Sequence, residues 1–290
     1  MQDFVYHSPG TLAEAITLLA EAAADGRRVY PLAGGTDLVP QMKEGLRAPG
    51  AVVNLKRISG LNGISRDEAG LRLGPLVTAT DLMESAVIRE HYPVLAEAAA
   101  TMAGVQICNM ATVGGNLCNA SPAADLAPPL IALRAVAQIA GPSGTRSVAL
   151  DEFFTGPGQT ALAPDELLTE ITVPASAAGA AAVYLKHAPR QAMEIAVVGV
   201  GAALWQEDGT CDDVRLVLGA VAPIPLRARR AEDSLRGGPL DDEAIAAAAR
   251  LAAEEARPID DLRGSAWYRR RMVEVLARRG LQRMRDERRA

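Results

Sequence analysis

Aromatic side chains are scarce in this sequence. Only 3% of its 290 residues are Phe, Trp or Tyr, although 49% are hydrophobic, because alanine is very abundant. So few rings argue against a surface that stacks sugars or nucleic-acid bases. The many small side chains suit closely packed helices and sheets, and the length allows two domains or one large domain with a full core.

Potential metal ligands are also few. No two cysteines form a CxxC pair, and no histidine stands near a second ligand at the spacing of a zinc site. The residues concerned are Cys108, Cys118, Cys211, His7, His91 and His187. We therefore expect buried thiols rather than a metal centre. An iron–sulfur cluster normally takes four cysteine ligands, so this chain does not supply one unaided.

Long apolar runs are missing too. No stretch reaches the roughly 20 apolar residues that span a bilayer, and the start, MQDFVYHSPG, does not read as a secretory signal. This predicts a cytoplasmic protein. The net charge of -5 disfavours nucleic acid as the main partner. The basic stretch YRRRMVEVLARRGLQRMRDERRA has apolar residues at helical spacing, which favours an amphipathic helix over a nucleic-acid arm.

What the sequence does have is two glycine pairs. Gly34 and Gly35, in PLAGGTDL, follow a predicted strand and precede Thr36 and Asp37. A backbone without Cβ atoms can approach an anionic ligand closely and point N–H groups at it. The glycines do not match the GxGxxG fingerprint. A tight turn, with Asp37 capping the next helix, explains the first pair equally well.

The second pair, Gly114 and Gly115, lies in ATVGGNLCNASPAAD, which we expect to be a loop. It brings polar groups into apolar surroundings, where they cost free energy unless they are hydrogen-bonded. A polar ligand is one solution, and a loop bonded to itself is the alternative. The polar residues are Thr112, Asn116, Asn119, Ser121 and Asp125. Together the two pairs suggest two sides of one long ligand, a dinucleotide.

The order of predicted elements divides the chain. The first sixty residues predict β-α-β-loop-α-β, and residues 70–174 predict strands and helices around the second glycine pair. A helix is expected to start at Thr80 or Asp81, another to run to Gly104, and the prolines of LAPPLIAL to break a short helix. After a small-residue linker, 175–182, strands come first and helices last, an α+β layer.

These motifs resemble those of a known family. ATVGGNLCNASPAAD and AGGTDL are similar to the two FAD-binding loops of the medium, flavoprotein subunit of the molybdenum hydroxylases, such as carbon monoxide, xanthine, nicotine and quinoline dehydrogenases. Three more stretches match: NLKRISGL, YLKHAPRQAMEIAVVGVGAAL and RGSAWYRRRMVEVLARRGL. The resemblance covers nearly the whole chain.

The resemblance implies an α+β fold. It consists of an FAD-binding domain of the vanillyl-alcohol-oxidase type over 1–175, with subdomains at about 1–58 and 59–175, and a smaller C-terminal α+β domain over 180–290. The absence of a Cys-rich insertion disfavours the benzoyl-CoA-reductase subgroup, which carries an extra cluster.

The resemblance also implies the residues that bind FAD. The first stretch would line the diphosphate with Pro31, Leu32, Ala33, Gly34, Gly35, Thr36, Asp37 and Leu38. The second would line its other side with Thr112, Gly114, Gly115, Asn116 and Asn119, and Asp125 matches a cofactor-bonding acid. Further candidates are Met102, Ala103, Glu194 and Ile195. Lys186 and Arg190 are weaker ones, and a plain surface charge explains each of them equally well. Glu194 stands where the family usually has Asp, a departure beside the flavin ring. No catalytic residue and no metal ligand is implied in this chain.

By resemblance, the chain passes electrons from two [2Fe-2S] clusters in a small partner subunit, through FAD, to an external acceptor. The substrate reacts on a large subunit with the molybdenum cofactor, in a dimer of heterotrimers. Two alternatives stay open: a flavin-free scaffold subunit, and a stand-alone FAD oxidase of the same wider fold. The sequence specifies neither the substrate nor the acceptor.

Overall fold

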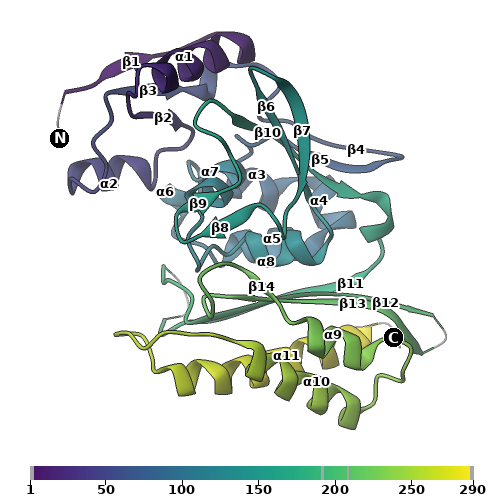
Figure 1. Cartoon of the computed structure of the whole chain (residues 1–290). Helices are drawn as coiled ribbons and strands as arrows, with labels where there is room; N and C mark the ends of the chain where they lie inside the picture. Colours follow the sequence, from purple (N-terminus) through teal and green to yellow (C-terminus); the bar gives the residue numbers. More distant parts are fainter. Residues whose placement is uncertain (1–2, 191–192, 208, 288–290) are drawn as a thin grey trace.

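The computed structural model describes residues 3–190, 193–207 and 209–287. Gln191 and Ala192, within one family stretch, and the last three residues of the basic terminus lie outside it. The chain forms three layers stacked in sequence order (Figure 1). The α+β fold class is confirmed, with both a small parallel sheet and larger antiparallel sheets.

The first layer is a small α/β unit. The predicted order of elements, β-α-β-loop-α-β, is confirmed, and the three strands pair in parallel in the order β1-β3-β2. Thr11 caps helix α1, as expected, by accepting a hydrogen bond from the Glu14 amide at 3.2 Å. Ala15 and Leu19 pack on Val53. The elements are β1 (Val5–His7), α1 (Leu12–Ala24), β2 (Val29–Leu32), α2 (Leu38–Lys43) and β3 (Ala51–Asn54).

The second layer is a five-stranded antiparallel sheet with helices packed below it. The strand order is β4-β5-β10-β6-β7, so the last strand of the layer enters its centre. The strands are β4 (Ile64–Asp67), β5 (Gly70–Leu73), β6 (Val136–Gly141), β7 (Gly144–Ala149) and β10 (Leu167–Pro174). The helices are α3 (Ala79–Glu84), α4 (Ala86–His91), α5 (Pro93–Ala100), α6 (Val105–Cys108), α7 (Val113–Asn119) and α8 (Ala127–Ala132).

Several predicted boundaries in this layer were wrong. Helix α3 begins at Ala79, because Thr78 and Asp81 form a capping box, and α5 ends at Ala100 rather than Gly104. The prolines of LAPPLIAL start helix α8 instead of breaking it, since the first turn needs no proline N–H. A short hairpin, β8 (Phe154–Gly156) and β9 (Gln159–Thr160), precedes β10.

The third layer is an antiparallel sheet, β11-β12-β13-β14, covered on both faces. Helices α9, α10 and α11 lie on one face and α8 on the other (Figure 1). Side chains alternate along each strand, so the sheet has an apolar surface on both faces. Ala203 and Val217 belong to the core shared with the second layer, while Ala202 and Leu216 belong to the core shared with the helices. The elements are β11 (Ala181–His187), β12 (Val198–Glu207), β13 (Thr210–Gly219), β14 (Leu226–Arg227), α9 (Arg229–Leu235), α10 (Asp242–Glu255) and α11 (Ala266–Glu287).

Helix α11 is the amphipathic helix expected from the basic C-terminal stretch, and it buries Val273, Leu276 and Leu281. Among the described residues, no helix combines the length and apolar character that crossing a bilayer would require.

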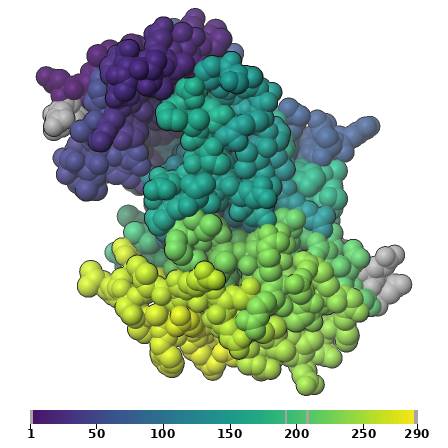
Figure 2. Space-filling view, viewed as in Figure 1, coloured from purple at the N-terminus to yellow at the C-terminus, as the bar shows by residue number. Residues whose placement is uncertain are grey.

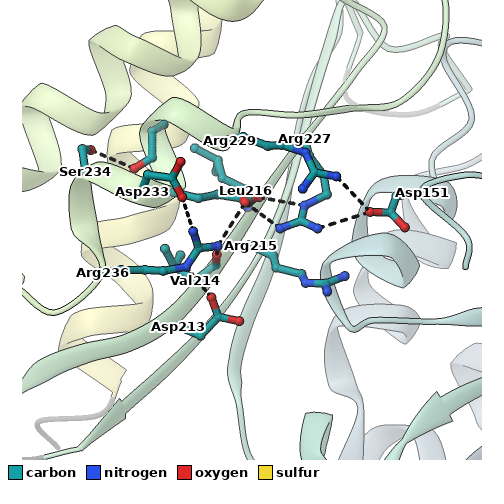
Figure 3. Close-up of polar contacts among 12 residues, drawn as sticks. Asp151, Asp213, Val214, Arg215, Leu216, Arg227, Arg229, Asp233, Ser234 and Arg236 are labelled. Atoms are coloured by element: carbon teal, nitrogen blue, oxygen red, sulfur yellow. Dashed lines mark hydrogen bonds and ion pairs between the residues drawn. The ribbon is translucent and has the colours of Figure 1, made fainter.

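Ion pairs join the second and third layers beside this sheet (Figure 3). Arg227 donates to Asp151 of the second layer at 3.2 Å and to the buried Glu232 of α9 at 2.6 Å. Glu232 also accepts from the Leu216 amide at 3.0 Å, so its charge is fully compensated. These contacts fix the C-terminal layer against the one that carries the second glycine pair.

Candidate flavin-binding site

A single cavity of about 830 Å³ collects residues from all three layers. The surface is recessed at the left of Figure 2, between the N-terminal and C-terminal residues. Seventeen of the predicted residues line the cavity: Pro31, Ala33, Gly34, Gly35, Thr36, Asp37, Leu38, Met102, Ala103, Thr112, Gly114, Gly115, Asn116, Asn119, Asp125, Glu194 and Ile195. Leu32 and Lys186 do not. Residues from both glycine pairs therefore face the same space.

The first glycine stretch offers unused backbone donors. Within the described parts of the chain, the amides of Gly34, Gly35 and Thr36 donate no hydrogen bond to another protein group. Asp37 occupies the cap position of α2, but its side chain makes no capping bond. Burial raises the pKa of this carboxyl, and Arg47 partly opposes the shift. Asp37 thus stands at the predicted cap position, but the predicted capping bond from its side chain is not made.

The two glycine stretches touch each other. Gly34 lies so close to Met110 that a Cβ on Gly34 would come 1.7 Å from the Met110 carbonyl oxygen. On the other side, Lys56 donates from Nζ to the Ala33 carbonyl at 2.9 Å. The backbone at residues 33–34 thus contacts both the segment that follows α6 and Lys56 of the 3-10 turn Leu55–Arg57. Only glycine fits at position 34.

The second glycine pair was predicted to lie in a loop, and this was wrong. Gly114 and Gly115 belong to the first turn of helix α7. Its amides are already paired: Gly114 donates to the Pro75 carbonyl at 2.8 Å and Gly115 to Thr112 Oγ1 at 3.0 Å. A Cβ on Gly114 would lie 2.5 Å from that of Pro75, so this glycine serves packing. The self-bonded alternative was correct for these N–H groups.

Asn116 keeps one unused acceptor. Its side-chain Oδ1 is buried and accepts no hydrogen bond in the described structure, and the residue lines the cavity. A buried polar atom without a partner costs free energy, which a ligand donor would recover. Asn119, one helical turn further, accepts from Gln41 of α2 at 3.3 Å. This bond joins α2 to α7.

Asp125 lines the cavity and belongs to a buried network of hydrogen bonds. It accepts a hydrogen bond of 2.6 Å from the Tyr184 hydroxyl and one of 2.9 Å from Lys186 Nζ. Lys186 also donates to the Thr101 carbonyl at 2.8 Å. Burial raises the pKa of Asp125, while the charge of Lys186 and both hydrogen bonds lower it. Lys186 therefore supports Asp125 from behind rather than lining the cavity.

Glu194 and Ile195 also line the cavity, and the Ile195 side chain is half-exposed. Glu194 pairs with Arg190 at 2.8 Å and accepts from the Ile195 amide at 3.1 Å. These bonds hold the pKa of Glu194 below its usual range. Met193 and Arg190 also line the cavity.

Some lining residues were not predicted. Tyr30 and Arg47, stacked with 4.9 Å between the guanidinium and the ring centroid, face one part of the cavity, and Leu167 and Leu168 of β10 face another. Leu167 and Leu168 sit in an ordinary strand pattern that indicates only burial. Arg47 lies in a loop with no motif, so no sequence signal marks it.

The arrangement fits a large anionic dinucleotide. Free amides at 34–36, an unpaired buried acceptor on Asn116 and a cavity within the usual range of cofactor sites meet in one place. The family model described as "FAD binding domain in molybdopterin dehydrogenase" matches residues 2–176, and "CO dehydrogenase flavoprotein C-terminal domain" matches residues 165–284. The chain belongs to the family of FAD-binding medium subunits of the molybdenum hydroxylases, a family of oxidoreductase subunits.

Particular relatives show how complete the match is. The putative xanthine dehydrogenase FAD-binding subunit of Escherichia coli K12 is 34% identical, over 96% of this chain and 95% of the relative. The solved carbon monoxide dehydrogenase from Hydrogenophaga pseudoflava superposes with a TM-score of 0.92 at 35% identity, over 97% and 96% of the two chains. Quinoline 2-oxidoreductase from Pseudomonas putida 86 gives 0.91 at 29% identity, over 99% and 98%.

Proposed function

We propose that this chain is the FAD-binding electron-transfer subunit of a heterotrimeric molybdenum hydroxylase. It takes electrons from [2Fe-2S] clusters of a small partner subunit and passes them to an external acceptor. The carrying observation is that both glycine stretches, Asp125 and the Glu194–Ile195 segment line one cavity. The solved relatives include a carbon monoxide dehydrogenase described as a Cu,Mo enzyme, which supports a molybdenum-containing complex here.

We assign the cofactor contacts to the predicted residues that line the cavity. The unused amides of Gly34, Gly35 and Thr36 bind the diphosphate, and α7 with Asn116 covers its other side. Asp125, held by Lys186 and Tyr184, accepts a hydrogen bond from the cofactor. Glu194 and Ile195 would lie beside the flavin ring, and Met102 and Ala103 would also contact the cofactor.

Bound FAD would supply the redox chemistry, exchanging electrons with the one-electron clusters of the partner subunit and with the external acceptor. The residues of this chain bind it, orient it and limit water around it. The apolar lining from Leu167, Leu168 and Met102 lowers the local polarity. Within the described residues, no group of three or more His, Cys, Asp or Glu side chains could hold a metal ion.

The proposal includes the organisation of the chain and its complex. The FAD-binding domain spans 1–175, in subdomains of about 1–58 and 59–175, and the C-terminal domain spans 180–290. The complex is a cytoplasmic dimer of heterotrimers with the molybdenum cofactor in the large subunit.

The test is the colour of the native complex. A complex purified through a tag on this chain should show flavin absorption that bleaches anaerobically with its substrate. The substrate would be sought among N-heterocycles, purines, aldehydes and carbon monoxide. A colourless complex with full activity would support the scaffold alternative instead. Bleaching by substrate of this chain alone would support a stand-alone oxidase.

A further inference from the structure

One positive charge at the cavity has no acidic partner in the protein. Within the described parts of the chain, two cationic side chains line the cavity, those of Arg47 and Arg190. Arg190 forms an ion pair with Glu194 at 2.8 Å. Arg47 forms no ion pair with a described carboxylate, and its side chain donates only one hydrogen bond there, from Nε to Gln41 Oε1 at 2.6 Å. Its two terminal nitrogens are therefore available to a ligand.

The carboxylates of the cavity leave the charge of Arg47 unused. Four of them line it: Asp37, Asp125, Glu166 and Glu194. Three have a cation of their own, in the pairs Asp125–Lys186, Glu166–Arg146 and Glu194–Arg190. Arg47 lowers the pKa of Asp37 through its charge, but burial raises that pKa by more. Since Asp37 would repel an anion bound beside it, the cation that acts on Asp37 is the one that such a ligand needs.

The guanidinium of Arg47 is held in one position. The backbone amide of Arg47 donates to the Gln41 carbonyl at 3.2 Å, and Nε is bonded to the side chain of the same glutamine. The guanidinium also lies over the Tyr30 ring, 4.9 Å from its centroid. These contacts fix the plane of the terminal nitrogens, which suits the oxygens of a phosphate. A side chain fixed in advance loses little entropy when a ligand binds.

Contacts between the walls show at which end of the cavity Arg47 lies. The start of α6 lies beside Met193, whose sulfur is 3.5 Å from the position that a Cβ of Gly104 would take. The segment after α6 contacts Gly34, and the last residue of α7 accepts a hydrogen bond from Gln41 at 3.3 Å. Because Gln41 holds Arg47, this order of contacts puts Arg47 beyond the first glycine pair, at the end away from Met193.

We propose that Arg47 recognises the adenosine half of FAD by binding the phosphate that carries the adenosine. This rests on the proposed function, in which the Glu194–Ile195 segment lies beside the ring and the amides at 34–36 bind the diphosphate. The terminal nitrogens of Arg47 donate to oxygens of the adenosine-side phosphate, and Tyr30 and Gln41 position them. Arg47 thereby favours the dinucleotide over FMN, which lacks this phosphate.

ADP tests the proposal, because it carries the adenosine and both phosphates without the flavin ring. The full chain, freed of flavin, is titrated with FAD and with ADP, and thermal unfolding checks that each variant is folded. Arg47→Met removes the charge and should weaken the binding of both ligands by roughly tenfold to a hundredfold, as expected for hydrogen bonds to a charged group. Arg47→Lys retains the charge and should recover part of the loss.

The matched control is Arg28→Met, which removes the charge of an exposed side chain outside the cavity and should bind both ligands like the wild type. An equal loss in this control would overturn the proposal. Wild-type affinities in Arg47→Met, a loss for FAD without a loss for ADP, or no recovery in Arg47→Lys would overturn it too.

The wild type itself separates this proposal from the proposed function. We expect it to bind ADP as well as FAD. Binding of FAD without ADP would refute recognition of the adenosine half and leave the FAD assignment standing. Binding of neither ligand would instead refute the proposed function.

Discussion

Gly34 and Met110 lie in contact, although 76 residues separate them: a Cβ on Gly34 would sit 1.7 Å from the Met110 carbonyl oxygen. This contact joins the loop after β2 to the segment that leads into α7. Because the loop and α7 both line the cavity, the distance between its two walls depends on a position without a side chain.

Gly34→Ala should therefore separate the two walls. We expect the free energy of unfolding to fall by about 1–3 kcal/mol, and the affinity for FAD to fall as well, because the backbone must shift. Urea denaturation and FAD titration measure the two effects. Gly63→Ala is the control, since a Cβ there meets no atom within 4 Å. If both variants bind FAD like the wild type, the contact is unimportant.

Substitutions at the second glycine pair should have different effects. Gly114→Ala crowds Pro75 and should lower the free energy of unfolding by about 1–3 kcal/mol, even without FAD. Gly115 lines the cavity, and a Cβ there would meet only Thr112 Oγ1, at 2.8 Å. Gly115→Val should therefore mainly lower FAD occupancy, while the C-terminal layer stays folded. Flavin content and thermal unfolding separate these effects. Normal FAD content in Gly115→Val would contradict the cofactor assignment of α7.

Lys186→Met should leave the Asp125 carboxylate buried without its cation. We expect a loss of roughly 3–5 kcal/mol in the free energy of unfolding near neutral pH. The pKa of Asp125, already raised by burial, should rise further without Lys186. The folded state then binds a proton that the unfolded state releases, so the stability of the variant should fall as pH rises from the ordinary aspartate range towards the raised pKa.

Urea denaturation at pH 5 and pH 8 tests the sign of this effect. Arg72→Met is the control, because its partner Glu170 belongs to an exposed pair, and it should cost less than about 1 kcal/mol. A Lys186→Met variant that gains stability between pH 5 and pH 8 would be inconsistent with a buried Asp125.

Cys118 should be unreactive although it lines the cavity. Burial raises the pKa of this thiol to about 12, so at pH 8 roughly one molecule in ten thousand carries the reactive thiolate. Iodoacetamide should modify the Cys118 peptide slowly at pH 8, and bound FAD should slow it further. Peptide mass spectrometry follows the reaction. Rapid alkylation that is insensitive to FAD would show that the residue lies outside the binding site.

The sequence predicted most of the fold and much of the cavity, because both are encoded in local patterns. Strand alternation, Thr11 as a cap and the helical spacing of the C-terminal stretch each depend on near neighbours. The second glycine pair was misassigned as a loop because its helix depends on Pro75 and Val77, which are distant in sequence. Arg47 was missed for the same reason, since only tertiary structure brings it to the cavity.

The role of Lys186 could not be predicted from the sequence alone. Its spacing from Tyr184 places both residues on one face of β11, but the sequence does not reveal that this face meets Asp125. Only the packing of the third layer against the second brings the three together. Sequence could therefore name the residue as a candidate but not distinguish a cofactor contact from a support.

The most direct test of the account is the flavin that the chain binds. The purified chain is incubated with excess FAD or FMN, desalted and denatured, and the released flavin is identified by chromatography. Because the free amides at 34–36 are assigned to the diphosphate, we predict equimolar FAD and far less FMN. No retained flavin, or FMN bound as well as FAD, would contradict the central claim.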